Sequence, residues 1–212
     1  MPNRYDVSGL LEAQFEPKSR GRVLRNLLGI YRKREMDSIE ADHLAKATDW
    51  AIRFYDVDHR FNAEDICLLH RQWLGTVYSW AGTYRQVNIG KGGFTFAMAA
   101  QIPRLMQEYQ RAILTIHTPC QFDSSERIIE ALAIAHCELV LIHPFRDGNG
   151  RIARLVSTLM ALQAGLPLLD FSGIKGPVRE SYFAAVQAAM SRDYEPMKRI
   201  FRGVLRRSGA TN

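Results

Sequence analysis

Two stretches of apolar residues at helical spacing lie on either side of a loop with little side-chain bulk, and this arrangement constrains the fold most. The apolar residues recur between Ile128 and Ile142 in the first stretch and between Ile152 and Met160 in the second. An amphipathic helix is stable in water when its apolar face is covered by other elements. The sequence therefore predicts two central helices in the core of a mainly helical domain.

The ends of the two core helices are marked in the sequence. Asp123 can cap the first helix while Glu126 reaches back to it, as in a capping box. The second helix is expected to begin near residue 149 or 150, and Gly165 ends it, since glycine commonly follows the last helical turn. A short loop therefore joins one helix C-terminus directly to the next helix N-terminus.

The rest of the chain is expected to form further helices and one β-hairpin. Residues 87–89 and 94–96 alternate apolar and polar side chains, and three glycines lie between the two runs, which predicts the hairpin. Further helices are predicted at 38–55, after a cap at Asn62, at 97–116 with Pro103 near its start or forcing a kink, at 179–191 and at 196–207. The expected organisation is an N-terminal arm (1–37), a core (38–191) and a basic C-terminal helix and tail (192–212).

Composition narrows the class of protein. The chain has 212 residues and no run of about 18 apolar residues, which a membrane helix would require. Its first residues contain no apolar signal segment and its three cysteines form no CxxC pair, so we expect a cytoplasmic protein with reduced thiols. The net charge of +6 fits a nucleotide-binding protein, a basic nucleic-acid-binding or scaffold protein, or simply a solvated basic surface.

The loop between the core helices, HPFRDGNGR at residues 143–151, concentrates groups that bind phosphate. Gly148 and Gly150 allow a tight turn and a close approach of the backbone to a ligand. The loop leads into a helix N-terminus, whose free N–H groups and dipole attract anions. Arg151 and Arg154 lie one turn apart at the start of this helix, and two guanidinium groups beside an N–H cradle fit a polyphosphate.

Two more residues of the loop indicate catalysis rather than binding alone. Asp147 would repel phosphate unless it holds a divalent cation such as Mg²⁺, although it could instead cap the second helix. His143 ends the first helix and can act as a general base near neutral pH. A base, an anion cradle, a metal-binding carboxylate and an arginine pair together predict phosphoryl or nucleotidyl transfer.

Extended to Arg154, this loop resembles the signature HPFx[D/E]GNGRxxR of the Fic family (the Fic/Doc superfamily) without a departure. The segment SWAGTYR at 79–85 and the hairpin add to the resemblance, which covers residues 38–191. The resemblance implies a Fic-like helical domain with a β-hairpin flap near the active-site loop. It also implies a protein adenylyltransferase, which transfers AMP from ATP to a Ser, Thr or Tyr hydroxyl of a target protein and releases pyrophosphate.

The resemblance also assigns roles to residues of the loop. His143 would deprotonate the target hydroxyl, and Phe145 would pack inward and hold the loop. Asp147 would bind Mg²⁺ on the α- and β-phosphates. The ATP phosphates would be bound by the amides of Gly148 and Gly150 and the side chain of Asn149 at the α-phosphate, and by Arg151 and Arg154 at the β- and γ-phosphates.

The hairpin resembles the flap with which the family docks an extended target segment by strand addition. A hairpin that serves only as a structural cover is the alternative. The residues expected to form the flap are Ile89, Gly90, Lys91, Gly92, Gly93, Phe94, Thr95 and Phe96.

One position of the motif distinguishes reactions within the superfamily. Doc-like kinases have a Lys in place of the second Gly of GNG, whereas this chain has Gly150, which favours AMP transfer over phosphate transfer. The motif leaves open a Fic-fold transferase that uses another donor, namely another nucleotide, phosphate or a phosphocholine compound.

Regulation is the last implication of the resemblance. Many Fic proteins are restrained by a helix with the pattern [S/T]xxxE[G/N], whose Glu pairs with the second arginine of the motif, here Arg154. Ser8 and Glu12 fit this pattern, but Ala13 replaces the Gly or Asn. Inhibition by Glu12 and inhibition by a separate small antitoxin-like partner therefore both stay open.

Overall fold

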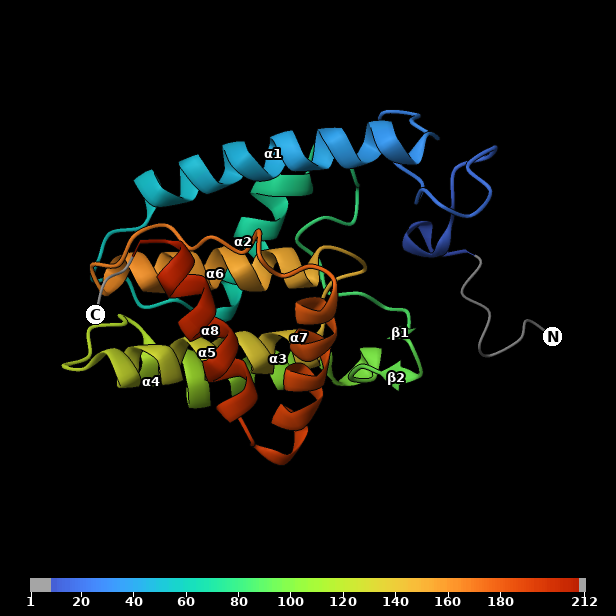
Figure 1. The fold of residues 1–212 in the computed structure, drawn as a ribbon. Coiled ribbons are helices and arrows are strands. Elements are labelled where there is room, and N and C mark those ends of the chain that lie inside the picture. The colour runs from blue at the N-terminus through green and yellow to red at the C-terminus, as the bar shows by residue number, and fades with distance from the viewer. Residues whose placement is uncertain (1–8, 210–212) are drawn as a thin grey trace.

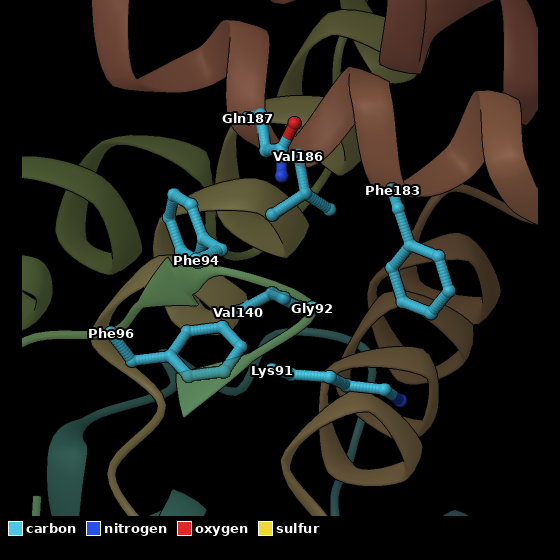
Figure 2. A pocket seen from close by; sticks show the side chains of 8 residues that line it. All are labelled: Lys91, Gly92, Phe94, Phe96, Val140, Phe183, Val186 and Gln187. Carbon is cyan, nitrogen blue, oxygen red and sulfur yellow. The ribbon is translucent and has the colours of Figure 1, made fainter. Parts of the chain in front are cut away.

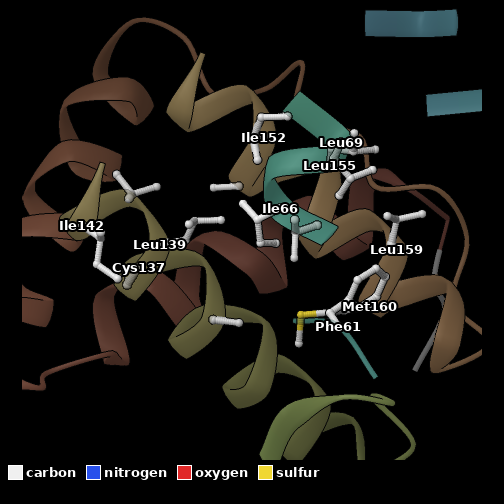
Figure 3. Packing of buried hydrophobic residues seen from close by; sticks show 14 of the residues in the cluster. Phe61, Ile66, Leu69, Cys137, Leu139, Ile142, Ile152, Leu155, Leu159 and Met160 are labelled. Carbon is white, nitrogen blue, oxygen red and sulfur yellow. The ribbon is translucent and has the colours of Figure 1, made fainter. Parts of the chain in front are cut away.

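Helices α5 (Ser125–Ile142) and α6 (Asn149–Gln163) lie at the centre of the fold and pack against each other, as their apolar stripes predicted. The structure is a computed structural model that describes residues 9–209. Figure 3 shows Ile66 with Leu139 of α5 and Leu155 of α6 in the buried apolar cluster. Around this centre, α2 (Ala63–Leu74) packs on α6 and on α1 (Lys33–Phe54), and α8 (Glu195–Arg207) packs on α5 and α7 (Pro177–Ala188) (Figure 1).

Helix α1 begins at Lys33, earlier than the residue 38 that the sequence predicted. The residue before it, Arg32, makes no side-chain capping hydrogen bond, so the sequence contained no capping signal at this point. Packing stabilises this extra turn, because Met36 is buried on the same face of the helix as Glu40. Tertiary packing therefore extends the helix beyond its local signals.

The cap of α5 also differs from the prediction. Ser124 is the N-cap, and its hydroxyl accepts a hydrogen bond from the N–H of Arg127 at 3.4 Å. Glu126 does not reach back to a capping residue but binds Arg202 of α8 at 2.8 Å. By contrast, the predicted cap at Asn62 is confirmed, since its side chain accepts from the two backbone N–H groups that open α2.

The predicted helix at 97–116 forms as one helical run. Pro103 lies in the first α-helical turn of this run, where its missing N–H costs no hydrogen bond. The run consists of η2 (Ala99–Gln101), α3 (Ile102–Tyr109), the π-helical η3 (Gln110–Leu114) and α4 (Thr115–His117). The remaining short helices are η1 (Leu11–Ala13) and η4 (Ala189–Ser191).

The predicted hairpin is confirmed and is short. Strand β1 (Gly90–Lys91) pairs antiparallel with β2 (Phe94–Thr95). The two residues between them, Gly92 and Gly93, have φ angles of +56° and +80°, which explains why glycine occupies both positions of this turn. The hairpin lies beside α7 (Figure 1), and Phe183, Val186 and Gln187 of this helix line a cavity together with Phe94.

Residues 9–32 form an arm without a long helix. An isolated antiparallel bridge joins Phe15 to Leu24, and the N–H of Leu27 donates to the carbonyl of Val77 at 2.8 Å. Val23 and Leu24 are buried, so the arm packs on the helical body. Within residues 9–209, no helix combines the length and apolarity needed to cross a bilayer.

Candidate active site

The α5–α6 loop is held in shape by its own buried residues. His143 ends α5 in the left-handed region, with φ +54°, and this turns the chain towards α6. Phe145 is fully buried, as expected, and stacks on His70 with ring centroids 3.9 Å apart. The Asn149 side chain accepts from the N–H of Phe145 and donates to its carbonyl oxygen, both at 2.8 Å. The Asn149 side chain therefore holds the loop in shape, and its expected contact with the α-phosphate stays a prediction.

The two glycines of the loop serve different purposes. Gly148 has φ +84°, and a Cβ atom there would lie 2.5 Å from the ring of Trp73, so only glycine fits. Gly150 lies in the first turn of α6, and a Cβ there would meet open space. Gly148 is thus required by packing. Gly150 lines the cavity and leaves the N-terminus of α6 open towards it.

His70 supports the loop as a neutral side chain. Its Nδ1 accepts from the N–H of Gly82 at 2.8 Å, so its Nε2 carries the proton and donates to the carbonyl of Asp147 at 3.1 Å. Burial lowers the pKa of His70 to about 4, which keeps this arrangement intact at neutral pH. His70 therefore fixes the backbone immediately before Gly148.

His143 is arranged as a base with one free nitrogen. Its Nδ1 lies 2.9 Å from the carbonyl of Val140 and donates to it, so Nε2 is the unprotonated nitrogen of the neutral ring. The ring stacks on Phe96 of the hairpin, with centroids 3.6 Å apart. Burial lowers the pKa of His143 to about 4, and the carbonyl of Val140 opposes this shift. The ring is therefore neutral, oriented and ready to accept a proton at pH 7.

Arg85 ties the hairpin to the catalytic loop. Its Nε donates to the carbonyl of His143 at 2.8 Å, and its two terminal nitrogens donate to the carbonyls of Val87 and Ala97, both at 2.6 Å. Its backbone N–H donates to the carbonyl of Pro144 at 2.9 Å. Val87 and Ala97 flank the hairpin, and Arg85 itself is only 2% exposed. One buried guanidinium group thus fixes both ends of the flap relative to the backbone of the base.

Glu12 packs against the same junction. Its carboxylate accepts from the N–H of Gln86 at 2.6 Å, and its carbonyl accepts from Nε of Arg146 at 2.7 Å. Its negative charge also favours the protonated form of Arg85 and partly offsets the lowering of the Arg85 pKa that burial causes. Glu12 makes no ion pair with Arg154 in this structure, so the pairing that the inhibitory pattern allows is not present here, and Ser8 of that pattern lies outside the described residues. The physical reason is that the arm places η1 at the base of the hairpin, where the N–H of Gln86 donates to the Glu12 carboxylate.

Both motif arginines line one cavity of about 670 Å³, together with His143, Asp147 and Gly150. Arg151 is held in place by acids: one terminal nitrogen lies 2.5 Å from Glu40, and the other lies 3.4 Å from Asp147. Its guanidinium carbon also lies 4.5 Å from the centroid of the Trp73 ring. These contacts orient the guanidinium group before any ligand binds.

Arg154 is held by aromatic rings instead. Its guanidinium carbon lies 5.6 Å from the ring centroid of Phe171 and 5.5 Å from that of Tyr182. Its Nε is buried and has no hydrogen-bond partner. An unpartnered buried donor on a cation is costly, so this side chain lacks an acceptor that an anionic ligand could supply.

Tyr182 in turn connects Arg154 to a buried histidine. Ser157 donates to the carbonyl of Ala153 at 2.8 Å, so its oxygen accepts from Nδ1 of His136 at 3.1 Å. The other nitrogen of His136 then accepts from the Tyr182 hydroxyl at 2.7 Å. A chain of hydrogen bonds inside the core therefore fixes Tyr182, whose ring lies beside the Arg154 guanidinium group.

Asp147 is the residue that could hold a cation. Its side chain is half exposed, and its Oδ1 accepts from its neighbour, the N–H of Gly148, at 2.7 Å. Gly148 is the N-cap of α6, so the alternative that Asp147 caps this helix is not supported. Within residues 9–209, no three His, Cys, Asp or Glu side chains converge to hold a metal ion. One exposed carboxylate beside a phosphate-sized cavity fits Mg²⁺, which takes its other ligands from phosphates and water.

A second, apolar cavity of about 230 Å³ lies between the hairpin and α7. Figure 2 shows Phe94 and Phe96 of the hairpin on one side and Phe183 and Val186 of α7 on the other. Lys91 lines this cavity and the phosphate-sized cavity, and its amine lies 4.9 Å from the Phe183 ring centroid. The two cavities are therefore neighbours that share the tip of the hairpin.

The tertiary structure adds residues that the sequence interpretation missed. Arg85 belongs to the segment SWAGTYR, which added to the family resemblance but assigned no role to Arg85. Glu40 carried one available signal, because it lies at helical spacing on the buried stripe of α1 that includes Met36 and Ala47. A carboxylate at such a position is rare unless it is paired. Trp73 and Tyr182 read as ordinary core residues, and nothing local distinguishes them.

Comparison with known proteins decides the family. The model of the Fic/DOC family matches residues 60–161, which include α2, the hairpin and the whole α5–α6 loop. A probable protein adenylyltransferase Fic of Salmonella typhimurium is 31% identical over 140 residues, which are 64% of this chain and 66% of that protein. The chain belongs to the Fic/DOC family. A protein adenylyltransferase Fic of Drosophila ananassae is 33% identical over 137 residues, and these span only 26% of that protein.

Solved structures show the same fold. The N-terminal Fic domain of a putative cell filamentation protein from Bartonella quintana superposes with a TM-score of 0.72 at 26% identity, covering 91% of both chains. The BepC protein of Bartonella tribocorum, solved with bound AMPPNP, gives a TM-score of 0.68 at 23% identity, covering 85% of this chain and 91% of that one. The Fic fold therefore extends over most of this chain, beyond the residues that the family model matches.

Proposed function

We propose that this Fic protein is an adenylyltransferase that moves AMP from ATP to a Ser, Thr or Tyr hydroxyl of a target protein and releases pyrophosphate. The observation that carries the proposal is the free Nε2 of a neutral His143 at the wall of a cavity that also contains two oriented guanidinium groups and a helix N-terminus. Relatives named protein adenylyltransferase Fic support the same reaction.

The base is His143 in this proposal. The target hydroxyl gives its proton to Nε2, its oxygen forms a bond to the α-phosphorus, and the bond from that phosphorus to the β-phosphate oxygen breaks. Nδ1 keeps its proton on the carbonyl of Val140, which steadies the ring as it becomes charged. Phe96 stacks on the ring and limits its rotation. The pyrophosphate leaves with the electron pair of the broken bond.

The phosphates are placed by the loop and the start of α6. The N–H of Gly150 at the start of α6 faces the α-phosphate, where negative charge increases during the reaction, whereas the N–H of Gly148 donates to Asp147. Arg151 and Arg154 bind the β- and γ-phosphates, and an oxygen there would satisfy the unpartnered Nε of Arg154. The apolar cavity under the hairpin suits a nucleotide base, since it adjoins the phosphate site through Lys91.

The cofactor, the flap and the regulation complete the proposal. Asp147 would hold Mg²⁺, which supplies charge neutralisation on the phosphates when bound. The hairpin would present the target segment next to His143, and its short strands leave an open edge for pairing. A cytoplasmic location and a separate antitoxin-like inhibitor belong to the proposal as well. Arg154 has no carboxylate partner among residues 9–209, so an inhibitor's carboxylate could reach it.

The test is a labelling experiment with two nucleotides. Purified protein is incubated with Mg²⁺, a bacterial lysate and ATP labelled at either the α- or the γ-phosphate, beside the His143→Ala variant. We expect protein to be labelled from α-labelled ATP alone, and this label to be lost in the variant. Label from γ-labelled ATP that depends on His143 would instead show phosphate transfer and refute the proposal.

A further inference from the structure

A groove on the N-terminal arm carries most of the excess charge of the chain. It has a volume of about 710 Å³ and is lined by Lys18, Arg20, Arg22, Tyr31, Arg32, Lys33, Arg34 and Asp37. Six cations against one carboxylate give this lining a net charge of 6 − 1 = +5, whereas the whole chain has only +6. The positive charge is therefore concentrated at one place rather than spread over a solvated surface. We call this surface the basic groove.

One wall of the basic groove is a turn that exposes its cations at a conformational cost. Lys18 and Arg20 both adopt the left-handed region, with φ of +68° and +56°, which is unfavourable for residues other than glycine. Ser19 between them is 2% exposed, and its N–H donates to the carbonyl of Glu16 at 3.1 Å. The turn is thus anchored at Ser19 and projects a cation on each side of it.

The other wall is the start of α1. Arg32, Lys33 and Arg34 are exposed there in succession, although positive charge is unfavourable at a helix N-terminus. Asp37 is the sole carboxylate among the described residues of the lining, and it is already paired with Lys33. The charge of the groove is therefore not balanced by its own residues, so an anionic partner would relieve repulsion on both walls.

The basic groove runs into the candidate active site. Lys33 and Asp37 line both this groove and the cavity that contains His143, Arg151 and Arg154. Figure 1 shows the arm and the hairpin at the same end of the molecule. A segment lying in the groove is therefore at the rim of the cavity in which the hydroxyl is modified.

We infer that the basic groove binds an acidic segment of the target protein, an inference that rests on the proposed function. Guanidinium groups pair with carboxylates through two parallel hydrogen bonds, and four of the six cations are arginines. The volume of the groove suits several side chains of an extended peptide rather than a nucleic-acid duplex. Such a contact raises the encounter rate and selects among targets without taking part in the chemistry.

The experiment measures binding directly. A fluorescein-labelled peptide of ten glutamates is titrated with the full chain and followed by fluorescence anisotropy, beside a labelled ten-nucleotide oligo(dT). The groove variant is Arg20→Glu with Arg34→Glu, one change on each wall. The matched control is Arg199→Glu with Arg206→Glu on α8, which changes the net charge equally at exposed positions away from the groove.

We expect the groove variant to weaken peptide binding about tenfold or more and the control variant to leave it nearly unchanged. Arg20→Gly is the second variant, because it removes a cation while relieving the left-handed strain, so weaker binding by it cannot come from unfolding. Equal weakening by groove and control variants overturns the inference. Tighter binding of oligo(dT) than of the peptide, lost in the groove variant, overturns it in favour of single-stranded nucleic acid.

Failure of the proposed function would look different. The His143→Ala variant should bind the peptide as well as the unaltered chain does, because His143 is not in the groove. Groove variants should label fewer lysate proteins from α-labelled ATP while binding a fluorescent ATP analogue normally. Intact peptide binding together with no AMP transfer by the unaltered chain would refute the enzymatic proposal alone.

Discussion

Helix α5 contains one fully buried histidine, His136, and ends at a partly buried one, His143, and the two rings differ in what their nitrogens bind. His136 and His143 lie about two turns apart, and burial lowers both pKa values, to about 3 and about 4. Both ring nitrogens of His136 are occupied, by Ser157 and by Tyr182. His143 uses one nitrogen on Val140 and leaves Nε2 without a protein partner among the described residues. The lowered pKa therefore does not distinguish the two rings, whereas the free nitrogen of His143 at a cavity does.

The largest expected effect separates these two residues. His143→Ala should reduce AMP transfer by about 10²- to 10⁴-fold, because it removes the general base, and should change stability little. His136→Ala should leave His143 in place but lower the free energy of unfolding by about 2–4 kcal/mol, because it opens a cavity and strands Tyr182 and Ser157. Initial rates and thermal melting of both variants test this. Equal losses of rate in the two variants, at equal stability, would contradict the different roles assigned to His143 and His136.

Replacement of Arg85 should come next, since Arg85 holds the reactive end of α5. Arg85→Met leaves the carbonyls of His143, Val87 and Ala97 without their donor, and we expect kcat to fall about 10- to 100-fold. Hydrogen exchange of residues 88–96 should speed up in the same variant. Arg85→Lys should recover part of kcat but not the protection of both flap ends. Unchanged exchange in the hairpin would show that Arg85 does not brace it.

Glu12→Gly tests the contact of η1 with the base of the hairpin. The inhibitory interpretation and the structure predict opposite changes in activity for this variant. An inhibitory Glu12 would make Glu12→Gly more active than the unaltered chain. The structure instead predicts lower activity by several fold and lower stability by about 1–3 kcal/mol, because Gln86 loses an acceptor and the charge of Arg85 loses a nearby carboxylate. Rates at saturating ATP decide between them, with Glu16→Gly in the same arm as the control. A rise in activity for Glu12→Gly alone would restore the inhibitory interpretation.

The pH range over which stability changes should differ between His136 and His143. An unfolded histidine titrates near 6.5, so the unfolded state binds more protons below that pH and the free energy of unfolding falls as the pH is lowered. Each buried histidine contributes a slope of up to about 1.4 kcal/mol per pH unit, ending near pH 4 for His143 and near pH 3 for His136. Urea titrations of His136→Gln and His143→Gln should each lose one such contribution. An unchanged slope in either variant would contradict its burial as a neutral ring.

The smallest expected effect concerns Tyr182, which lies between His136 of α5 and Arg154 of the proposed nucleotide site. Tyr182→Phe keeps the ring beside Arg154 but removes the hydroxyl that donates to His136 and fixes this ring. We expect the KM for ATP to rise about two- to fivefold with little change in kcat at saturation, since a single hydrogen bond is worth about 1 kcal/mol. A change in kcat without a change in KM would place Tyr182 in the chemistry instead.

The sequence by itself determined the local parts of this protein. The apolar stripes predicted α5 and α6, Asn62 marked the start of α2, and the glycines at 92 and 93 fixed the hairpin turn. The loop motif also predicted that His143, Asp147, Arg151 and Arg154 lie close together, and these residues line one cavity because all of them are near the junction of α5 and α6. Signals that act over a few residues are readable without the fold.

Only the tertiary structure decided which groups these residues meet. Glu40 pairs with Arg151 from 111 residues away, and Arg85 reaches the carbonyl of His143 across 58 residues. Glu12 fitted an inhibitory pattern, yet the arm's packing directs it to Gln86. A side chain's partner depends on which surfaces the core brings together, and no short pattern encodes that. The same holds for the basic groove, whose two walls become one surface only when the arm folds back on α1.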